Sequence, residues 1–276
     1  VRAEVVVAAR GIARAFRSLP AVATSWPQDT ASFCNGVKIA TVADRPSRIV
    51  MLVTVKNLNP GDITAIGGRG GACLQRNTRD PAQQTLTWLG QVQLDSSRTA
   101  RWQIAPAVEA RIRFRAVAVH EMLHALGIGT TTVLSSKFRD VPFTGPQSVA
   151  AFAAAGGLGG VPFTSDGAHV DPAAFDVPLR LLFRYRVTPS PREIMLIDGD
   201  SPEMSSISAA ILMDLGYDLD LSRVLAYQLP AVVYAPFGIP VSIMAGLTSA
   251  RPSPLGAGGR RTGGGPVSQV GDGLVP

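Results

Sequence analysis

The sequence of 276 residues is poor in the side chains that most often bind metals or form crosslinks, with only three histidines and two cysteines. Two cysteines are too few for a scaffold held by several disulfides, but they can form one bridge or remain as two buried thiols. The hydrophobic content of 46% is enough to bury a full core. A disordered chain and a small disulfide-rich domain are therefore excluded.

Long uninterrupted apolar runs are also missing. The most apolar stretch, residues 229–247, is interrupted by Pro230, Pro236 and Pro240, and proline disfavours a helix interior. We therefore expect no transmembrane helix. Residues 5–9 are too short an apolar run for the core of a signal peptide.

The charge balance is basic, with 26 Lys and Arg against 20 Asp and Glu. Arginines cluster in two places, at 111, 113 and 115 and at 180, 184 and 186. They alternate with apolar residues, as on the solvated faces of helices and strands, and no nucleic-acid-binding signature accompanies them. We therefore do not expect nucleic acid as a partner.

The main positive feature is the run His120-Glu121-Met122-Leu123-His124. On a helix, residues four apart lie one above the other, so both imidazoles can reach one ion while Glu121 reaches a water bound to it. Apolar residues recur at steps of three and four around the motif, at Ile112, Ala116, Val119, Leu123 and Leu126. This periodicity predicts a helix over residues 108–126 with the histidines off its buried stripe, facing a cleft.

Gly127 follows the helix and predicts its end. In the longer zinc-peptidase pattern H-E-x-x-H-x-x-G-x-x-H, a histidine three residues after the glycine completes the zinc shell. That position is Thr130 here, which is not a credible ligand. His169, the remaining histidine, lies in a loop and is the predicted third ligand, with Asp166 and Asp171 as alternatives.

The pattern of the rest of the chain predicts an α+β protein. We predict helices over 3–18, 147–155 and 205–215, and strands over 37–42, 49–55 and 85–94. The first helix is expected to turn Val6, Ala9, Ala13 and Phe16 inward. The glycine-rich residues 67–71 lack the Lys-Ser/Thr of a phosphate-binding loop and are interpreted as a flexible turn.

With these elements in place, the chain resembles the leishmanolysin-like zinc metallopeptidases of the metzincin clan over residues 34–219. The matching pieces are the run from His120 to Gly127, Phe143-Thr144-Gly145-Pro146 before an Ala-rich helix, Ala168-His169-Val170 with Phe175, Glu193-Ile194-Met195, and the run from Leu212 to Tyr217. Residues 176–192 form an insertion relative to the family, which places its methionine sooner after the third histidine.

The resemblance implies a two-lobed endopeptidase with a twisted mixed sheet, one Zn²⁺ held by His120, His124 and His169, and a methionine-bearing turn beneath the metal. The turn methionine would be Met195, with a plain core residue as the alternative. Cys73 matches a family cysteine that pairs with an earlier one, here Cys34. A disulfide indicates an oxidising compartment, so we expect a secreted or cell-surface protein.

The domains expected are an N-terminal lobe over 1–128, a smaller loop-rich lobe over 129–221, and a tail over 222–276 that is apolar, then Gly/Pro-rich and partly disordered. We expect a monomer that acts on protein or peptide substrates, which could pair with residues 85–94 as an edge strand. Glu121 would be the catalytic base. The alternative is a catalytically inactive binding or adhesion module that keeps the same fold.

Overall fold

The computed structural model describes most of the chain up to residue 233. The described residues are 2–18, 33–34, 37–38, 49–58, 60, 67–75, 86–97, 107–130, 142–175, 186–187, 193–196, 201–229 and 232–233. Within them, helices and short sheets are combined in an α+β arrangement. The predicted tail therefore falls largely outside the described residues, as does the insertion at 176–192 apart from one short strand.

The largest sheet is mixed and has three strands. They are β4 (Val50–Lys56), β5 (Gly68–Gln75) and β6 (Thr87–Asp95), in the order β4-β6-β5. β6 pairs in parallel with β4 and antiparallel with β5. The prediction that residues 85–94 form an edge strand is therefore wrong. β6 is central, and its Leu89, Val92 and Leu94 are completely buried, because its apolar residues are covered on both faces.

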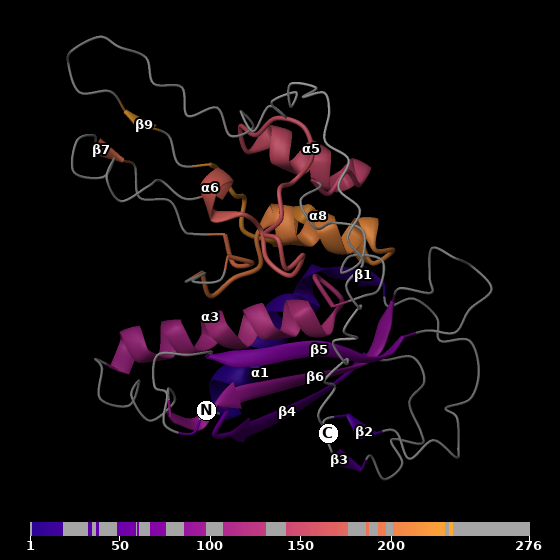
Figure 1. Cartoon of the computed structure of the whole chain (residues 1–276), viewed down its shortest axis with the longest axis vertical. Coiled ribbons are helices and arrows are strands. Elements are labelled where there is room, and N and C mark those ends of the chain that lie inside the picture. Colours follow the sequence, from indigo (N-terminus) through magenta and orange to yellow (C-terminus); the bar gives the residue numbers. More distant parts are fainter. Residues whose placement is uncertain are drawn as a thin grey trace, which may run out of the picture.

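Helix α3 (Ala107–Ala125) lies across this sheet and packs on β5 and β6 (Figure 1). From Phe114 onward most of its residues are buried, whereas Ile112 is 42% exposed, contrary to its expected place on the buried stripe. The first turns of α3 extend beyond the covering elements, and the exposed Glu109 and Arg113 form an i, i+4 ion pair there.

Gly68, Gly70 and Gly71 are part of strand β5, so the interpretation of the glycine-rich residues as a turn is wrong. A Cβ built on Gly70 would lie 1.9 Å from the carbonyl oxygen of Glu121 in α3, and one on Gly68 would lie 2.7 Å from Glu121 Cγ. Glycine is needed because the α3 backbone approaches the strand too closely for any side chain.

Helix α1 (Arg2–Ala15) packs against α3, and Glu4 forms an ion pair with Arg115 at 2.8 Å. The face that α1 buries consists of Ala8, Ile12 and Ala15, so the predicted inward face is wrong. The run Val5-Val6-Val7 puts apolar residues around the helix, and packing on α3 selects between the possible faces. Strand β1 (Phe16–Ser18) then pairs antiparallel with β8 (Asp218–Leu219).

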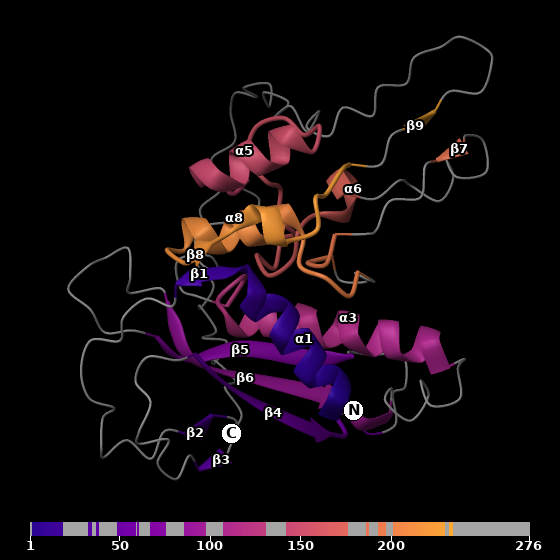
Figure 2. The same cartoon turned by 180° about the vertical axis from the view of Figure 1, so that it is seen from behind.

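The remaining helices lie on the side of α3 away from the sheet, as both views of the molecule show (Figures 1 and 2). They are α5 (Pro146–Ala154), α6 (Pro172–Phe175) and α8 (Ser206–Asp214). α5 packs on α8, and Asp214 accepts hydrogen bonds from the backbone of Gln147 and Ser148. The short elements are β2 (Phe33–Cys34), β3 (Val37–Lys38), β7 (Arg186–Val187), η1 (Leu221–Arg223) and β9 (Val232–Val233).

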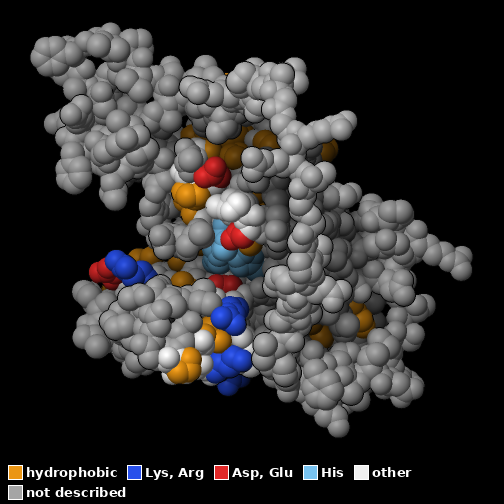
Figure 3. Space-filling view, in the orientation of Figure 1, with side chains coloured by type: hydrophobic (Ala, Val, Ile, Leu, Met, Phe, Trp, Pro, Cys, Tyr) orange, Lys and Arg blue, Asp and Glu red, His pale blue; other side chains and the backbone are white. Residues whose placement is uncertain are grey.

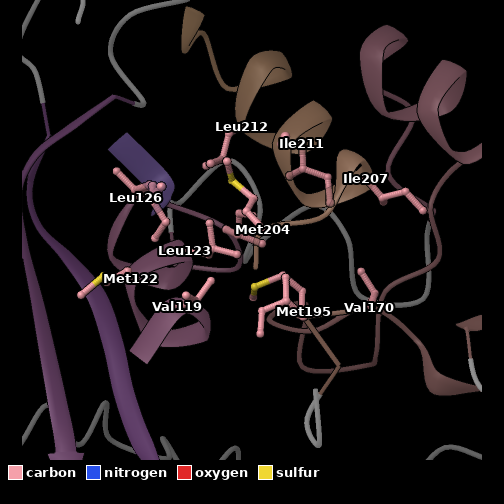
Figure 4. Packing of buried hydrophobic residues seen from close by; sticks show 14 of the residues in the cluster. Val119, Met122, Leu123, Leu126, Val170, Met195, Met204, Ile207, Ile211 and Leu212 are labelled. Carbon is pink, nitrogen blue, oxygen red and sulfur yellow. The ribbon is translucent and has the colours of Figure 1, made fainter. Parts of the chain in front are cut away.

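A continuous apolar core joins α3 to α8. Val119 and Leu123 of α3, and Leu126 directly after it, belong to the same buried cluster as Ile207 and Ile211 of α8 (Figure 4). Near it, the Tyr217 hydroxyl accepts from Thr87 N and donates to Leu126 O, each at 2.9 Å. One side chain thus connects β6, the end of α3 and the turn after α8. Among the described residues, no helix has the length and apolarity needed to span a membrane.

Candidate metal centre

Helix α3 places the first two histidines side by side. His120 and His124 are one helical turn apart, and their Nε2 atoms are 3.1 Å from each other. Both side chains are buried, at 8% and 6% exposure. The last two turns of α3 therefore present two ring nitrogens to one point.

The third histidine reaches the same point from the loop before α6. Isolated bridges join Phe143 to Val161 and Phe163 to Val170, and they fold this loop back toward α3. His169 Nε2 lies 3.3 Å from His124 Nε2. The three histidines form a group whose ligand atoms all lie within 4.8 Å of one another and that could hold a metal ion.

Each ring also makes an outward hydrogen bond through Nδ1. The partners are Ile194 O for His120 at 2.6 Å, Ile128 O for His124 at 2.7 Å, and Asp166 Oδ2 for His169 at 3.2 Å. Carbonyl and carboxylate oxygens only accept, so each Nδ1 carries a hydrogen and each Nε2 faces the other two rings.

This arrangement fits a tetrahedral metal ion. With metal–nitrogen distances of roughly 2.0–2.1 Å, ligand atoms of a tetrahedral zinc lie about 3.3–3.4 Å apart. The observed separations of 3.1 and 3.3 Å are close to this value. Burial lowers the pKa of His120 to about 4 and lowers that of His124 well below its usual value, so both rings are neutral near pH 7. Three converging lone pairs repel one another unless a cation lies between them.

Glu121 lies between the two helical histidines and faces strand β5. The backbone N–H of Gly70 donates to its carboxylate, and Gly68 leaves room for its side chain. Burial raises the pKa of Glu121 to about 8, although the Gly70 hydrogen bond and the Arg69 charge act in the opposite direction. Glu121, which directly follows His120 in the chain, is therefore a carboxyl group with a raised pKa.

The turn that ends α3 is part of the site. Gly127 has φ = 121° and Gly129 has φ = 71°, a conformation that favours glycine. The turn presents Ile128 O to His124, and a Cβ on Gly129 would lie 2.4 Å from Ala168 Cα. Thr130 Oγ1 donates to the carbonyl oxygen of His124 at 2.6 Å. Gly129 therefore lets the His169 loop approach the helix.

Asp166 is not part of the histidine group but holds the third histidine in place. Its carboxylate accepts from His169 Nδ1, from Ala168 N and from the Thr164 hydroxyl. Partial burial acts to raise the pKa of Asp166, but these hydrogen bonds outweigh it and lower the pKa to about 2. Asp171, the other alternative ligand, is also outside the group of three histidines.

Residues 193–196 form a turn that contacts the site from the side of α8. Ile194 O accepts from the His120 ring, and Met195 is completely buried (Figure 4). Glu193 is also completely buried, and burial raises its pKa against the lowering effect of hydrogen bonds from Ser205 and Ser208. Glu193 does not belong to the histidine group.

Of the two cysteines of the predicted disulfide, the structure describes the side chain of Cys73 only. Cys73, in β5, is disulfide-bonded. The side chain of Cys34 lies outside the described residues.

His169 is the most exposed histidine of the group. The side chain of His169 is 20% exposed. The space-filling view shows histidine side chains at the surface, with acidic groups on either side and basic groups below them (Figure 3).

Sequence reasoning identified the three histidines of the group but missed the residues that support them. Ile128 and Ile194 act through backbone carbonyls, for which residue type carries no signal. Two of the supports could have been found from the sequence. Gly129 belongs to the Gly-Ile-Gly run after the helix, and Asp166 is a carboxylate three residues before His169.

Comparisons with family models and with curated proteins assign the chain to no family. No family model matches the chain, and no curated protein matches it.

Proposed function

We propose that this chain is a zinc-dependent endopeptidase with a metzincin-like fold, in which His120, His124 and His169 hold the zinc and Glu121 is the catalytic base. The observation that carries the proposal is the convergence of three Nε2 atoms beside a buried carboxyl group. The mixed sheet, the helix lying across it and the turn at Met195 are consistent with such a fold.

The donor set favours zinc over Mg²⁺ and Ca²⁺. Imidazole nitrogens suit Zn²⁺, whereas Mg²⁺ and Ca²⁺ prefer oxygen ligands. Three protein ligands leave a fourth tetrahedral position, which is typical of catalytic rather than structural zinc sites. The outward bonds to Ile194, Ile128 and Asp166 keep the ligand nitrogens aimed at one point.

When bound, zinc would polarise the scissile carbonyl and lower the pKa of a water in the fourth position. Glu121 would take the proton of that water and later deliver it to the departing amine nitrogen, acting first as base and then as acid. Burial raises the pKa of its carboxyl to about 8, and a nearby cation would lower it, toward the neutral range in which both transfers are efficient.

Strand β5 supports a peptide substrate. Among the described residues it pairs with β6 on one side only, and Gly70 contacts Glu121. An extended peptide could therefore add to the other edge of β5 by main-chain hydrogen bonds and pass the catalytic carboxyl. We further propose that the protein is a monomer and that it is secreted or displayed at the cell surface. The disulfide-bonded Cys73 supports this location.

The test is to measure zinc content and peptide hydrolysis of wild type and Glu121→Gln. We expect about one zinc per chain in both proteins, chelator-sensitive hydrolysis by wild type, and a loss in kcat of roughly 10²- to 10⁴-fold in the variant. Glu109→Gln, at an exposed position of the same helix, is the control and should keep wild-type activity.

Two results would count against the proposal in different ways. Equal activity of Glu121→Gln and wild type would remove Glu121 from the mechanism. Tight zinc binding by wild type without hydrolysis of any peptide in a degenerate library would favour the inactive binding module instead.

A further inference from the structure

The turn at residues 193–196 holds two of the three histidines at once. Ile194 O accepts from the ring of His120 at 2.6 Å. The next carbonyl, Met195 O, accepts from the backbone N–H of Val170 at 3.1 Å. Val170 directly follows His169, so consecutive carbonyls of one turn position a ligand from α3 and a ligand from the loop.

The turn is itself fastened to the start of helix α8 by one side chain. Glu193 Oε1 accepts from the hydroxyl of Ser208, in the first turn of α8, and also receives the N–H of Met195 at 3.4 Å. Ser205 caps the same helix by accepting from Ser208 N at 3.0 Å. Glu193 thus joins its own turn to the start of α8.

The environment of Glu193 indicates that its role is to make hydrogen bonds rather than to carry charge. The residue is 0% exposed, and the hydroxyls of Ser205 and Ser208 both donate to its carboxylate. No described residue forms an ion pair with it. Burying a carboxyl group without an ion pair is unfavourable, so an apolar residue would serve better if packing were its only role.

We propose that Glu193 is a positioning residue of the metal centre, which uses its hydrogen bond with Ser208 to lock the 193–196 turn so that Ile194 O and Met195 O hold His120 and the His169 loop. The inference rests on the proposed metal centre. It adds that helix α8, which carries no ligand, controls metal affinity through this contact. Supports of this kind typically change metal affinity by about 10- to 100-fold when removed.

The test compares two serines that are alike except for what they support. Ser208 and Ser148 are both completely buried, and each hydroxyl donates to a carboxylate, Glu193 for one and Asp214 for the other. Ser148 lies in α5 and does not contact the 193–196 turn through any described hydrogen bond. Ser208→Ala and Ser148→Ala should therefore destabilise the protein similarly but differ at the metal.

Zinc affinity would be measured by competition with a chromophoric chelator, next to the melting temperature of the metal-free protein. We expect Ser208→Ala to lose about 10-fold or more in zinc affinity, and Ser148→Ala to stay within about 2-fold of wild type. Glu193→Gln keeps an acceptor oxygen in place and should retain affinity, whereas Glu193→Ala should lose it. If Ser208→Ala binds zinc as tightly as Ser148→Ala, the proposal is wrong, whether or not Glu193→Ala folds.

A metal-free readout separates this proposal from the proposed function. In the ¹⁵N–¹H spectrum of the metal-free protein, the Nδ1–H of His120 should be protected and downfield in wild type and in Ser148→Ala. It should be lost or shifted in Ser208→Ala. Wild type that fails to bind zinc would overturn the proposed function, while an unchanged His120 signal in Ser208→Ala would overturn the role of Glu193 alone.

Discussion

Each histidine of the cluster makes one directed contact outward and leaves one nitrogen facing the other rings. His120 and His124 bond to backbone carbonyls, and His169 bonds to a carboxylate. These contacts fix the tautomer and ring orientation before any ion binds. Little reorganisation is then needed on binding, because the rotamers of two of the rings are already held by burial.

The carboxyl of Glu121 makes a residue-scale prediction about stability. Its pKa is raised to about 8 in the folded protein from an ordinary value of 4.5. Such a group contributes stability that is complete below pH 4.5 and is lost as the pH rises through 8, since the unfolded chain ionises first. In metal-free Glu121→Gln the side chain at position 121 does not titrate. The free energy of unfolding of the variant, relative to that of wild type, should therefore rise between pH 4.5 and 8, by at most about 5 kcal/mol.

The measurement is the free energy of unfolding of both proteins in excess chelator, by urea denaturation at several pH values. Glu109→Gln, at an exposed position of α3, should differ from wild type by no more than about 0.5 kcal/mol throughout. A stability difference between Glu121→Gln and wild type that does not change between pH 4.5 and 8 would contradict the prediction.

At the scale of elements, the close contact between α3 and β5 positions Glu121. Gly70 meets the backbone of Glu121, and Gly90 of β6 meets Ala125, where an added Cβ would lie 2.8 Å from the alanine Cβ. The helix therefore rests directly on strand backbone at two points. A side chain at either glycine would force α3 and its ligands away from the sheet.

Gly70→Ala should be strongly destabilising because its Cβ would lie 1.9 Å from Glu121 O. We expect a loss of more than about 3 kcal/mol in the free energy of unfolding, or failure to fold. Gly71→Ala is the matched control, since the nearest atom to its Cβ is Gln91 Nε2 at 4.0 Å. It should change stability by about 1 kcal/mol or less, and equal destabilisation by the two variants would refute the contact.

Elements with a local apolar pattern were predicted within a few residues, including the strands over 49–55 and 85–94, observed as Val50–Lys56 and Thr87–Asp95. The range predicted for the histidine helix, 108–126, differs by one residue at each end from the observed one, because apolar periodicity and Gly127 are both local signals. The glycines of β5 were misread as a turn because glycine is required there by a contact with α3, about 50 residues away along the chain. Local composition carries no record of such a contact.

At the scale of the whole molecule, the histidine cluster joins two sides of the structure. His120 and His124 belong to the helix that covers the sheet, and His169 belongs to the segments on the opposite side of that helix (Figures 1 and 2). A metal ion bound by all three would crosslink these parts and stabilise the folded state by mass action.

We therefore expect Zn²⁺ at about 100 times its Kd to stabilise wild type by about 2.7 kcal/mol, or a rise in melting temperature of roughly 5–10 °C. His169→Ala should lose more than half of this rise at the same zinc concentration, because one crosslinking ligand is gone. Mg²⁺, which prefers oxygen ligands, is the control and should have little effect on either protein. Undiminished stabilisation of His169→Ala would place the third ligand elsewhere.

The sequence alone determined the two histidines and the carboxylate on one helix, since their spacing and the helical period are both local properties. Tertiary structure decided which loop comes to them, which strand lies beside Glu121, and which carbonyls hold the rings. These depend on contacts between distant segments: β5 with α3, Gly129 with Ala168, and the 193–196 turn with both His120 and Val170. Backbone carbonyls are the same in every residue type, so only the folded chain shows which of them meet the histidines.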